Sequence, residues 1–431
     1  MKKTIFALII FMCIPFVYGQ NSSINYGGGE FTFENTTDNC LSSDDRESIQ
    51  MRLRINANRL REEGKLNFSD DREDVKFIWP LQKADGFEWN SYYGISNYVD
   101  QDPTGGLGDY HCDERTYEGH KGTDIFSWPF PWYMVDNDLV EVIAGEEGVI
   151  IEKDDGFDDD HCECVGSWNA VYVQHADGSV AWYGHMKEGS LTDKEVGESV
   201  VEGEFLGIVA SSGCSTGPHL HLEVYDSGIN LIDPYAGDCN DLNVDSWWEV
   251  QPENREPSIN TILTHDVTPE HGCPSVNEDP HMSNDFYPGD DVITAFYFHD
   301  ALAGTDGDYR LRMPDGTIWE SWSNTMGVTY NASWWWWSWS LPESGPFGVW
   351  TLEADYEGET VIHEFNYGVY ANLEDNDALP NIGIAPNPSN TEFVTITGLT
   401  EQTVVEIFDA SGKRIKRIKL NGNQLNVSDI A

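Results

Sequence analysis

Basic residues are scarce in this chain. Its 431 residues include 24 Lys and Arg against 75 Asp and Glu, which gives a formal net charge of -51. A polyanion such as nucleic acid would be repelled by this charge, and so would an anionic membrane surface. We interpret the acidity as a solvated surface that keeps the protein soluble, and we expect no nucleic-acid partner.

Long apolar runs are also missing. Lys2 and Lys3 precede an apolar run from Ile5 to Val17, and Gly19 follows it. The run is shorter than the roughly 20 residues that span a bilayer. This order of basic, apolar and small residues is typical of a secretory signal peptide, residues 1–19, cleaved after Gly19. Loss of two lysines leaves -51 - 2 = -53, and we expect a secreted, extracellular protein without a transmembrane segment.

One of the eight cysteines lies in the signal peptide, so the mature chain keeps seven. An odd number leaves at least one without an intramolecular partner. Disulfides are expected in an oxidising compartment. We predict that Cys112 pairs with Cys162 or Cys164, and that Cys214 pairs with Cys239.

Two acidic regions could in principle bind an additional metal. The sequence His-Cys-Glu-Cys at 161–164 has zinc-ligating residue types, but its acidic surroundings favour a disulfide. The clusters at 154–160 and 300–308 could bind calcium, which prefers several oxygen ligands. Their spacing fits no standard calcium loop, so we interpret them as solvated loops.

The composition changes several times along the mature chain. Residues 20–74 are polar, with a helix expected near Asp44 to Glu63, where apolar residues are loosely periodic. Residues 75–240 contain short apolar runs broken by Gly, Asp and Asn, which are typical of strands and hairpins. Ala176-Asp177-Gly178 is a predicted hairpin turn.

A second strand-rich segment spans residues 253–370. Turns at 314–316 and 357–358 divide it, and an immunoglobulin-like β-sandwich is the expected fold. Its run of tryptophans at 334–339 could form a platform for sugar rings, or it could be a strand whose tryptophans pack in the core. The two interpretations remain open here.

Three separated motifs contain histidines. Zinc in a hydrolytic site takes three ligands of the His, His and carboxylate kind and leaves a fourth position for water. His120 and Asp124 form a close His and carboxylate pair. His219 and His221 lie two apart in a run with strand character, so their side chains project to the same face. His185 alone could equally be a hairpin-end residue bonded to backbone.

The motifs H-x3-D, Y-x-H and S-T-G-P-H-L-H-x-E-V, in this order, resemble those of the lysostaphin-type zinc metallopeptidases, also called glycyl-glycine endopeptidases, over about residues 75–237. The resemblance implies an antiparallel two-sheet β-fold with an open groove, and one Zn2+ per catalytic domain. It also assigns five residues: the zinc ligands His120, Asp124 and His221, and the catalytic residues His185 and His219.

The predicted chemistry is hydrolysis of a peptide bond by a zinc-activated water, whose pKa falls towards ~7. Because no H-E-x-x-H glutamate is present, we assign His219 as the general base and His185 as a donor to the oxyanion, or a sharing of these roles. The leading hypothesis is a secreted endopeptidase of peptidoglycan cross-bridges. The alternatives are a peptidase of Gly-rich extracellular proteins and a non-catalytic wall-binding or adhesion module.

The C-terminal residues 380–431 follow a polar linker at 372–377. They contain five acidic and five basic residues, and this abrupt change in charge marks a separate module. The module resembles the C-terminal sorting domain of the type IX secretion system of Bacteroidota, which an N-P motif opens. The resemblance implies the secretion machinery as a partner and attachment to the cell surface. The family's final aromatic and basic strand is missing, so we expect either a truncated module or a degenerate sorting signal. The expected fold class is therefore mostly β: an antiparallel two-sheet domain, a β-sandwich and a small partial C-terminal β-module.

Overall fold

The computed structural model describes most of the mature chain. The described residues are 25–32, 40–66, 75–368, 383–385, 393–397, 403–408, 414–420 and 424–426. The predicted signal peptide and the predicted linker at 372–377 lie outside them. Two compact units are present, residues 1–368 and residues 369–431. Within the described residues, no helix has the length and apolarity that a bilayer crossing requires.

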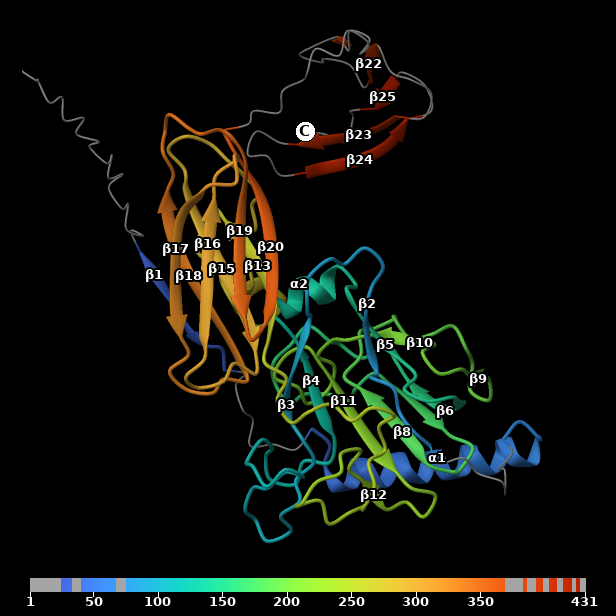
Figure 1. Cartoon of the computed structure of the whole chain (residues 1–431). Helices are drawn as coiled ribbons and strands as arrows, with labels where there is room; N and C mark the ends of the chain where they lie inside the picture. Colours follow the sequence, from blue (N-terminus) through green and yellow to red (C-terminus); the bar gives the residue numbers. More distant parts are fainter. Residues whose placement is uncertain are drawn as a thin grey trace, which may run out of the picture. The chain divides into compact units, whose positions relative to one another are not determined.

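The first unit contains the sheet that carries the histidine motifs (Figure 1). Eight strands form it, in the order β3-β4-β11-β8-β7-β6-β9 with β12 paired to β11. Their bounds are β3 Tyr93–Asn97, β4 Thr123–Ser127, β6 Gly148–Asp154, β7 Ala170–Gln174, β8 Val180–Gly184, β9 Ser199–Val200, β11 His219–Tyr225 and β12 Leu231–Ile232. A smaller sheet has the order β10-β5-β2, with β2 Leu81–Lys83, β5 Val140–Ile143 and β10 Phe205–Ile208. The named pairs in both sheets are antiparallel, as predicted.

Apolar and polar side chains alternate along β11, so one face of the strand is apolar and the other carries the polar side chains. Leu220, Leu222 and Val224 are buried in the core that also contains residues of the smaller sheet. Because successive side chains of a strand point to opposite faces, the two histidines of β11 and Glu223 project from the other face. The predicted hairpin turn at 176–178 is confirmed, since it connects the paired strands β7 and β8.

Helix α1, Ser43–Glu62, packs on that other face of the large sheet (Figure 1). Ser42 begins it with a capping box, accepting a hydrogen bond from the Asp45 N–H while the Asp45 carboxylate accepts one from the Ser42 N–H. Its buried apolar residues are spaced three or four apart: Ile49, Leu53, Ala57 and Leu60. The helix expected near 44–63 is therefore confirmed. A short helix, α2 Pro131–Asp136, follows β4.

Two further sheets of the first unit pack against each other. One has the order β1-β18-β15-β13 and the other β14-β20-β19-β16-β17. Their shared core includes Phe296, Trp339, Trp350 and Phe365. The bounds are β1 Tyr26–Glu30, β13 Ser258–His265, β14 Asp285–Phe286, β15 Asp291–His299, β16 Asp306–Arg312, β17 Ile318–Thr325, β18 Ala332–Ser340, β19 Gly348–Tyr356 and β20 Glu359–Tyr367, with the 3-10 turn η1 Ser275–Asn277.

The tryptophan run lies on β18 and alternates between two apolar clusters. Trp335 and Trp337 pack on the core shared by the two sheets. Trp334 and Trp336 pack on a second cluster, formed with residues of β4 and the segment that follows it. None of the tryptophans in the run is exposed. The structure therefore favours core packing over a platform for sugar rings.

Strand β1 was not expected from the polar lead-in. Its sequence Tyr-Gly-Gly-Gly-Glu pairs with the tryptophan run. A Cβ at Gly28 would lie 2.2 Å from the Trp334 carbonyl oxygen, and Gly28 has a positive φ of 120°. Glycine is therefore required for the close approach of these two strands.

The second unit contains two small antiparallel sheets. One has the order β21-β22-β25 and the other pairs β23 with β24. Their bounds are β21 Gly383–Ala385, β22 Phe393–Thr397, β23 Thr403–Phe408, β24 Arg414–Leu420 and β25 Gln424–Asn426. Val394, Ile396 and Leu425 are buried.

The predicted disulfide pairing is wrong. Strand contacts bring different partners together, as in the antiparallel bridge between Cys164 and Cys214. The other two pairs span 127 and 111 residues, a separation that spacing alone does not reveal. The observed disulfides are Cys112–Cys239, Cys162–Cys273 and Cys164–Cys214. The choice of disulfides over a metal at 161–164 is confirmed.

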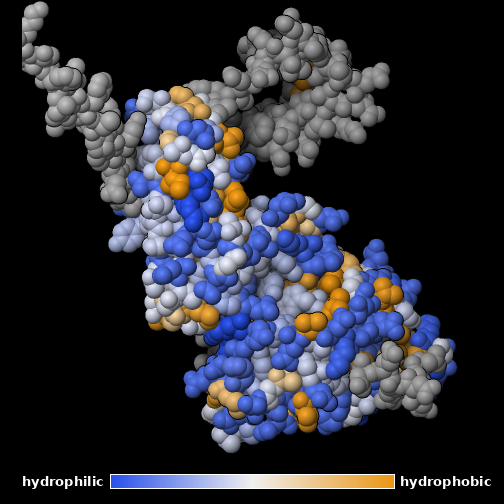
Figure 2. Space-filling view, in the orientation of Figure 1, coloured by the Kyte–Doolittle hydropathy of each residue, from blue (hydrophilic) through white to orange (hydrophobic). Residues whose placement is uncertain are grey.

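Charged side chains of the acidic regions make ion pairs in the described part of the chain. Among the described residues, the groups of side chains that could hold a metal ion lie around His221. Asp300 is buried and paired with Arg115 and Arg255, and Asp154 is paired with Arg52. Hydrophilic residues dominate the face of the molecule shown in Figure 2, as the acidic composition implies.

Candidate metal centre

Adjacent strands of the large sheet bring the three predicted ligands together. His221 on β11 lies opposite Asp124 on β4, and His120 reaches the same place from the turn that precedes β4. His221 Nδ1 lies 2.7 Å from Asp124 Oδ1 and 3.3 Å from His120 Nε2. His120 Nε2 lies 3.1 Å from Asp124 Oδ2. All three side chains are buried, so their polar atoms converge in one small space.

Each of these side chains is oriented by a further contact. His120 Nδ1 lies 2.7 Å from the Tyr98 carbonyl oxygen and donates to it. The other ring nitrogen, Nε2, is therefore the one that can bind a metal. Asn97 Nδ2 donates to Asp124 Oδ2 at 3.1 Å. His221 Nε2 faces Glu223 Oε1 at 3.9 Å. A hydrogen bond such as that of His120 Nδ1 fixes ring orientation and tautomer in histidine metal sites.

The two predicted catalytic histidines lie beside this group. The ring centroids of His185 and His219 are 4.4 Å apart, and His219 Nε2 lies 3.6 Å from Asp124 Oδ1. His219 Nδ1 donates to the Gly217 carbonyl at 2.8 Å, and His185 Nδ1 donates to the Ser212 carbonyl at 2.6 Å. Both rings therefore present Nε2 to the site, and the structure brings all five predicted residues together.

Burial and neighbouring charges set the protonation of this group. Burial opposes ionisation of Asp124, but the charges of His120 and His219 together with hydrogen bonds from His120 and His221 outweigh it and hold the pKa of Asp124 well below 3.8. Burial, together with His219 and His221, holds the pKa of His185 well below 6.5. Burial also lowers the pKa of His219, although the Asp124 charge opposes the shift. His185 and His219 are therefore neutral at neutral pH, with Nε2 able to accept a proton.

Three further residues that shape the site were missed. A Cβ at Gly122 would lie 2.6 Å from Cε1 and Nε2 of His221, so only glycine fits there. Its place inside the H-x3-D motif could have signalled a close approach. Trp168 packs against His185 and His221, with ring centroids 5.3 and 5.8 Å away. Cys40 Sγ lies 3.7 Å from both ring nitrogens of His221, and nothing in the sequence signals this contact across 181 positions.

The donor set fits a zinc ion. Two imidazole nitrogens and one carboxylate are the usual ligands of a hydrolytic zinc site. The ligand atoms of His120, Asp124 and His221 all lie within 4.8 Å of one another. One ion placed among them would satisfy three buried polar groups at once.

A buried His, Asp and His set on an antiparallel sheet, with two neutral histidines beside it, is characteristic of metal-dependent hydrolases. Residues 119–234 match the model of Peptidase family M23. This match contains all five predicted site residues.

Curated relatives match over a shorter segment. The DD-carboxypeptidase/endopeptidase Mpg of Neisseria meningitidis serogroup B is 41% identical over 63 residues, which are 15% of this chain and 14% of the relative. The same protein of Neisseria gonorrhoeae matches at 41% over 63 residues. The chain thus spans about a seventh of the length of these relatives.

Two solved structures are among those that this chain resembles in part. The catalytic domain of lysostaphin from Staphylococcus simulans is 25% identical, with 34% of this chain and 90% of that chain covered and a TM-score of 0.22. A catalytic-domain mutant of the prophage-encoded M23 protein EnpA from Enterococcus faecalis is also 25% identical, with 33% and 88% covered and a TM-score of 0.22.

Proposed function

We propose that this protein is a secreted zinc metalloendopeptidase that hydrolyses peptide bonds in peptidoglycan cross-bridges. The observation that carries the proposal is the convergence of His120 Nε2, the Asp124 carboxylate and His221 Nδ1, with neighbouring ligand atoms 2.7 to 3.3 Å apart. The M23 match supports the peptidase class. The name of the Neisseria relatives, DD-carboxypeptidase/endopeptidase, supports a cell-wall peptide as the substrate.

The metal would be held by His120, Asp124 and His221. When bound, zinc supplies an activated water and polarises the scissile carbonyl. Glu223 Oε1 lies 3.9 Å from the other ring nitrogen of His221, and His221 Nδ1 points into the site.

The protons would be carried by His185 and His219. Both are neutral with Nε2 free, because each Nδ1–H is engaged by a backbone carbonyl. A neutral imidazole in this tautomer accepts a proton at Nε2, and only the resulting imidazolium can donate one there. We therefore assign His219 as the base that takes the proton of the water. His185 would donate to the oxyanion only after it has itself been protonated, so the two roles are shared within the pair.

The test uses purified cell wall and a Gly-rich protein as substrates. We expect release of new amino groups from the cell wall, and release from the Gly-rich protein alone would instead support the alternative substrate. His221→Ala should abolish both bound zinc and hydrolysis. The exposed His111, which lies outside the site, gives the control: His111→Ala should keep both. If neither the wild-type chain nor any folded variant with stoichiometric zinc hydrolyses either substrate, the enzymatic function is contradicted and a wall-binding module is the remaining alternative.

Export is part of the proposal. Three disulfides among the described residues support an oxidising compartment. Residues 1–19 would direct the chain across the inner membrane, and residues 380–431 would engage the type IX machinery and attach the protein to the cell surface. The exported protein should begin at Gln20 when its N-terminus is sequenced, and deletion of residues 380–431 should retain it inside the producing cell. Normal release of the deleted form would contradict the sorting role.

A further inference from the structure

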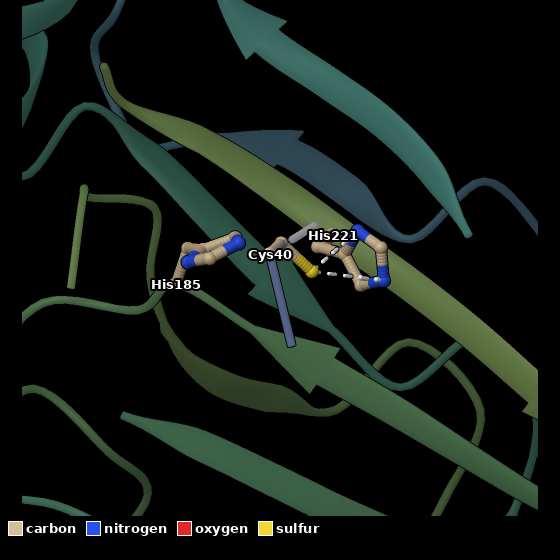
Figure 3. A group of neighbouring side chains, drawn as sticks. All are labelled: Cys40, His185 and His221. Carbon is tan, nitrogen blue, oxygen red and sulfur yellow. Dashed lines mark hydrogen bonds between the residues drawn. The ribbon is translucent and has the colours of Figure 1, made fainter. Parts of the chain in front are cut away.

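Cys40 lies in the candidate metal centre although it belongs to the segment that precedes the M23 match. It is the one cysteine outside a disulfide in the described part of the chain, and it is buried. Its sulfur lies 3.7 Å from Nδ1 and from Nε2 of His221. The sulfur and one ring nitrogen each of His185 and His221 all lie within 4.8 Å of one another. Figure 3 shows Cys40 between the two histidines.

His185 gives an independent sign of a ligand at this point. Its side chain is fully buried, and its Nε2 has no hydrogen-bond partner among the described residues. Its Nδ1 is already engaged by the Ser212 carbonyl. A buried polar atom without a partner is rare and calls for an ion or a water. The same space is therefore bordered by a free thiol and a free imidazole nitrogen.

The chain around Cys40 is held firmly in this place. Arg46 Nη1 donates to the carbonyl of Leu41 at 2.5 Å, and Arg46 Nε donates to Glu223 Oε1 at 2.8 Å. Glu223 lies two residues from His221 on the same face of β11. One arginine thus connects the backbone next to Cys40 to the strand that carries the predicted ligand.

Helix α1 covers the face of the sheet from which His219 and His221 project. Its residues Ile49 and Leu53 share a buried cluster with Tyr172, Trp182 and Tyr225. Tyr225 lies on β11 an even number of residues from the two histidines, so its side chain points to the same face of the sheet as theirs. The helix and the metal centre are therefore on one face. A peptide substrate must approach the metal from this face. Residues 40–66 occupy part of it.

We propose that the Cys40 thiolate is a fourth protein ligand of the metal, and that residues 40–66 thereby keep the peptidase latent. This rests on the proposed function. A hydrolytic zinc site keeps its fourth position open for water, whereas four protein ligands make a closed, structural site. On coordination the thiol releases its proton to solvent and the sulfur takes the position of the water. Withdrawal of residues 40–66 would reopen that position.

The experiment uses the full chain loaded with cobalt in place of zinc. A thiolate bound to cobalt gives a charge-transfer absorption band in the near ultraviolet that nitrogen and oxygen ligands lack. We expect this band in the wild-type protein and its loss in Cys40→Ser, with one cobalt bound in both. Leu41→Ala is the matched control, because it loosens the same segment but retains the thiol and should keep the band. Circular dichroism verifies that each variant is folded.

Activity gives the second measurement. Cys40→Ser loaded with zinc should hydrolyse cell wall faster than the wild-type protein by about tenfold or more, since activity follows the fraction of molecules with an open site. Stoichiometric cobalt without the band in the wild-type protein would overturn the ligand assignment. Equal hydrolysis by wild type and Cys40→Ser would overturn the latency. Either result leaves the proposed peptidase intact, whereas failure of every variant to bind metal would reject the proposed function itself.

Discussion

Replacement of Arg46 by methionine is expected to destabilise the sheet that carries the candidate metal centre. The side chains of Arg46 and Glu223 are 6% and 0% exposed, and their ion pair is 2.8 Å long. Burial raises the pKa of Glu223, but the charges and hydrogen bonds of Arg46 and His221 together outweigh it and hold that pKa below 4.5, so Glu223 is charged. Arg46→Met would leave a buried carboxylate without its cation.

The magnitude follows from the burial of both partners. Removal of one member of a buried pair costs about 3 to 5 kcal/mol. Arg46→Met combined with Glu223→Leu removes both charges and should cost only about 1 kcal/mol, for the lost hydrogen bond to the Leu41 carbonyl. The partly exposed pair of Arg310 and Glu353 is the control, and Arg310→Met should cost about 1 kcal/mol or less.

The assay is urea unfolding followed by circular dichroism at a fixed zinc concentration. The free energies of unfolding of the proteins in the double-mutant cycle are compared with one common m value, the slope of that free energy against urea concentration. The expected order of stability is wild type, double mutant, then Arg46→Met. A double mutant as unstable as Arg46→Met would refute the reasoning, and so would a single-mutant cost below about 1 kcal/mol.

Three further changes test the site and its surroundings. Gly122→Ala would place a Cβ 2.6 Å from the His221 ring, and zinc affinity should fall about 10- to 100-fold in a chelator competition; unchanged affinity would show that the ring can move. His219→Ala should keep zinc and lower kcat by about 100- to 10,000-fold, and loss of the metal would contradict its assignment as a base. Burial raises the pKa of Glu278 from 4.5 to about 8, so the folded state binds this proton more tightly. The tighter binding of this proton stabilises the folded state fully below pH 4.5. This stabilisation, roughly 4 to 5 kcal/mol, is lost as the pH rises to about 8. Glu278→Gln should remove this dependence from thermal unfolding curves, and an unaltered dependence would assign it to other groups.

Local patterns predicted the elements on which the site is built. Apolar residues three or four apart and a capping serine define α1, and the alternation of β11 determines which side chains share a face. The turn at 176–178 joins neighbours in sequence, so short-range chemistry determines it. The convergence of His120, Asp124 and His221 followed from the motifs of a resembling family, since three distant segments carry no mutual signal in a single sequence.

Features that depend on distant contacts could not be predicted. The disulfides join residues that are far apart in the sequence. Cys112 was predicted to pair with Cys162 or Cys164, but it pairs with Cys239. Strand β1 has three glycines and little strand propensity, and it exists because it pairs with the tryptophan run. Cys40 carries no local signal at all. Its position depends on the docking of α1 against the sheet.

The most direct test of the account is the zinc content of the purified full chain and of three single variants, His120→Ala, Asp124→Ala and His221→Ala. The account predicts one zinc per wild-type chain and strong loss of zinc from each variant, because each of these three ligands is needed for tight binding. Full retention of zinc by any one of the three folded variants would contradict the shared metal centre on which the proposed function depends.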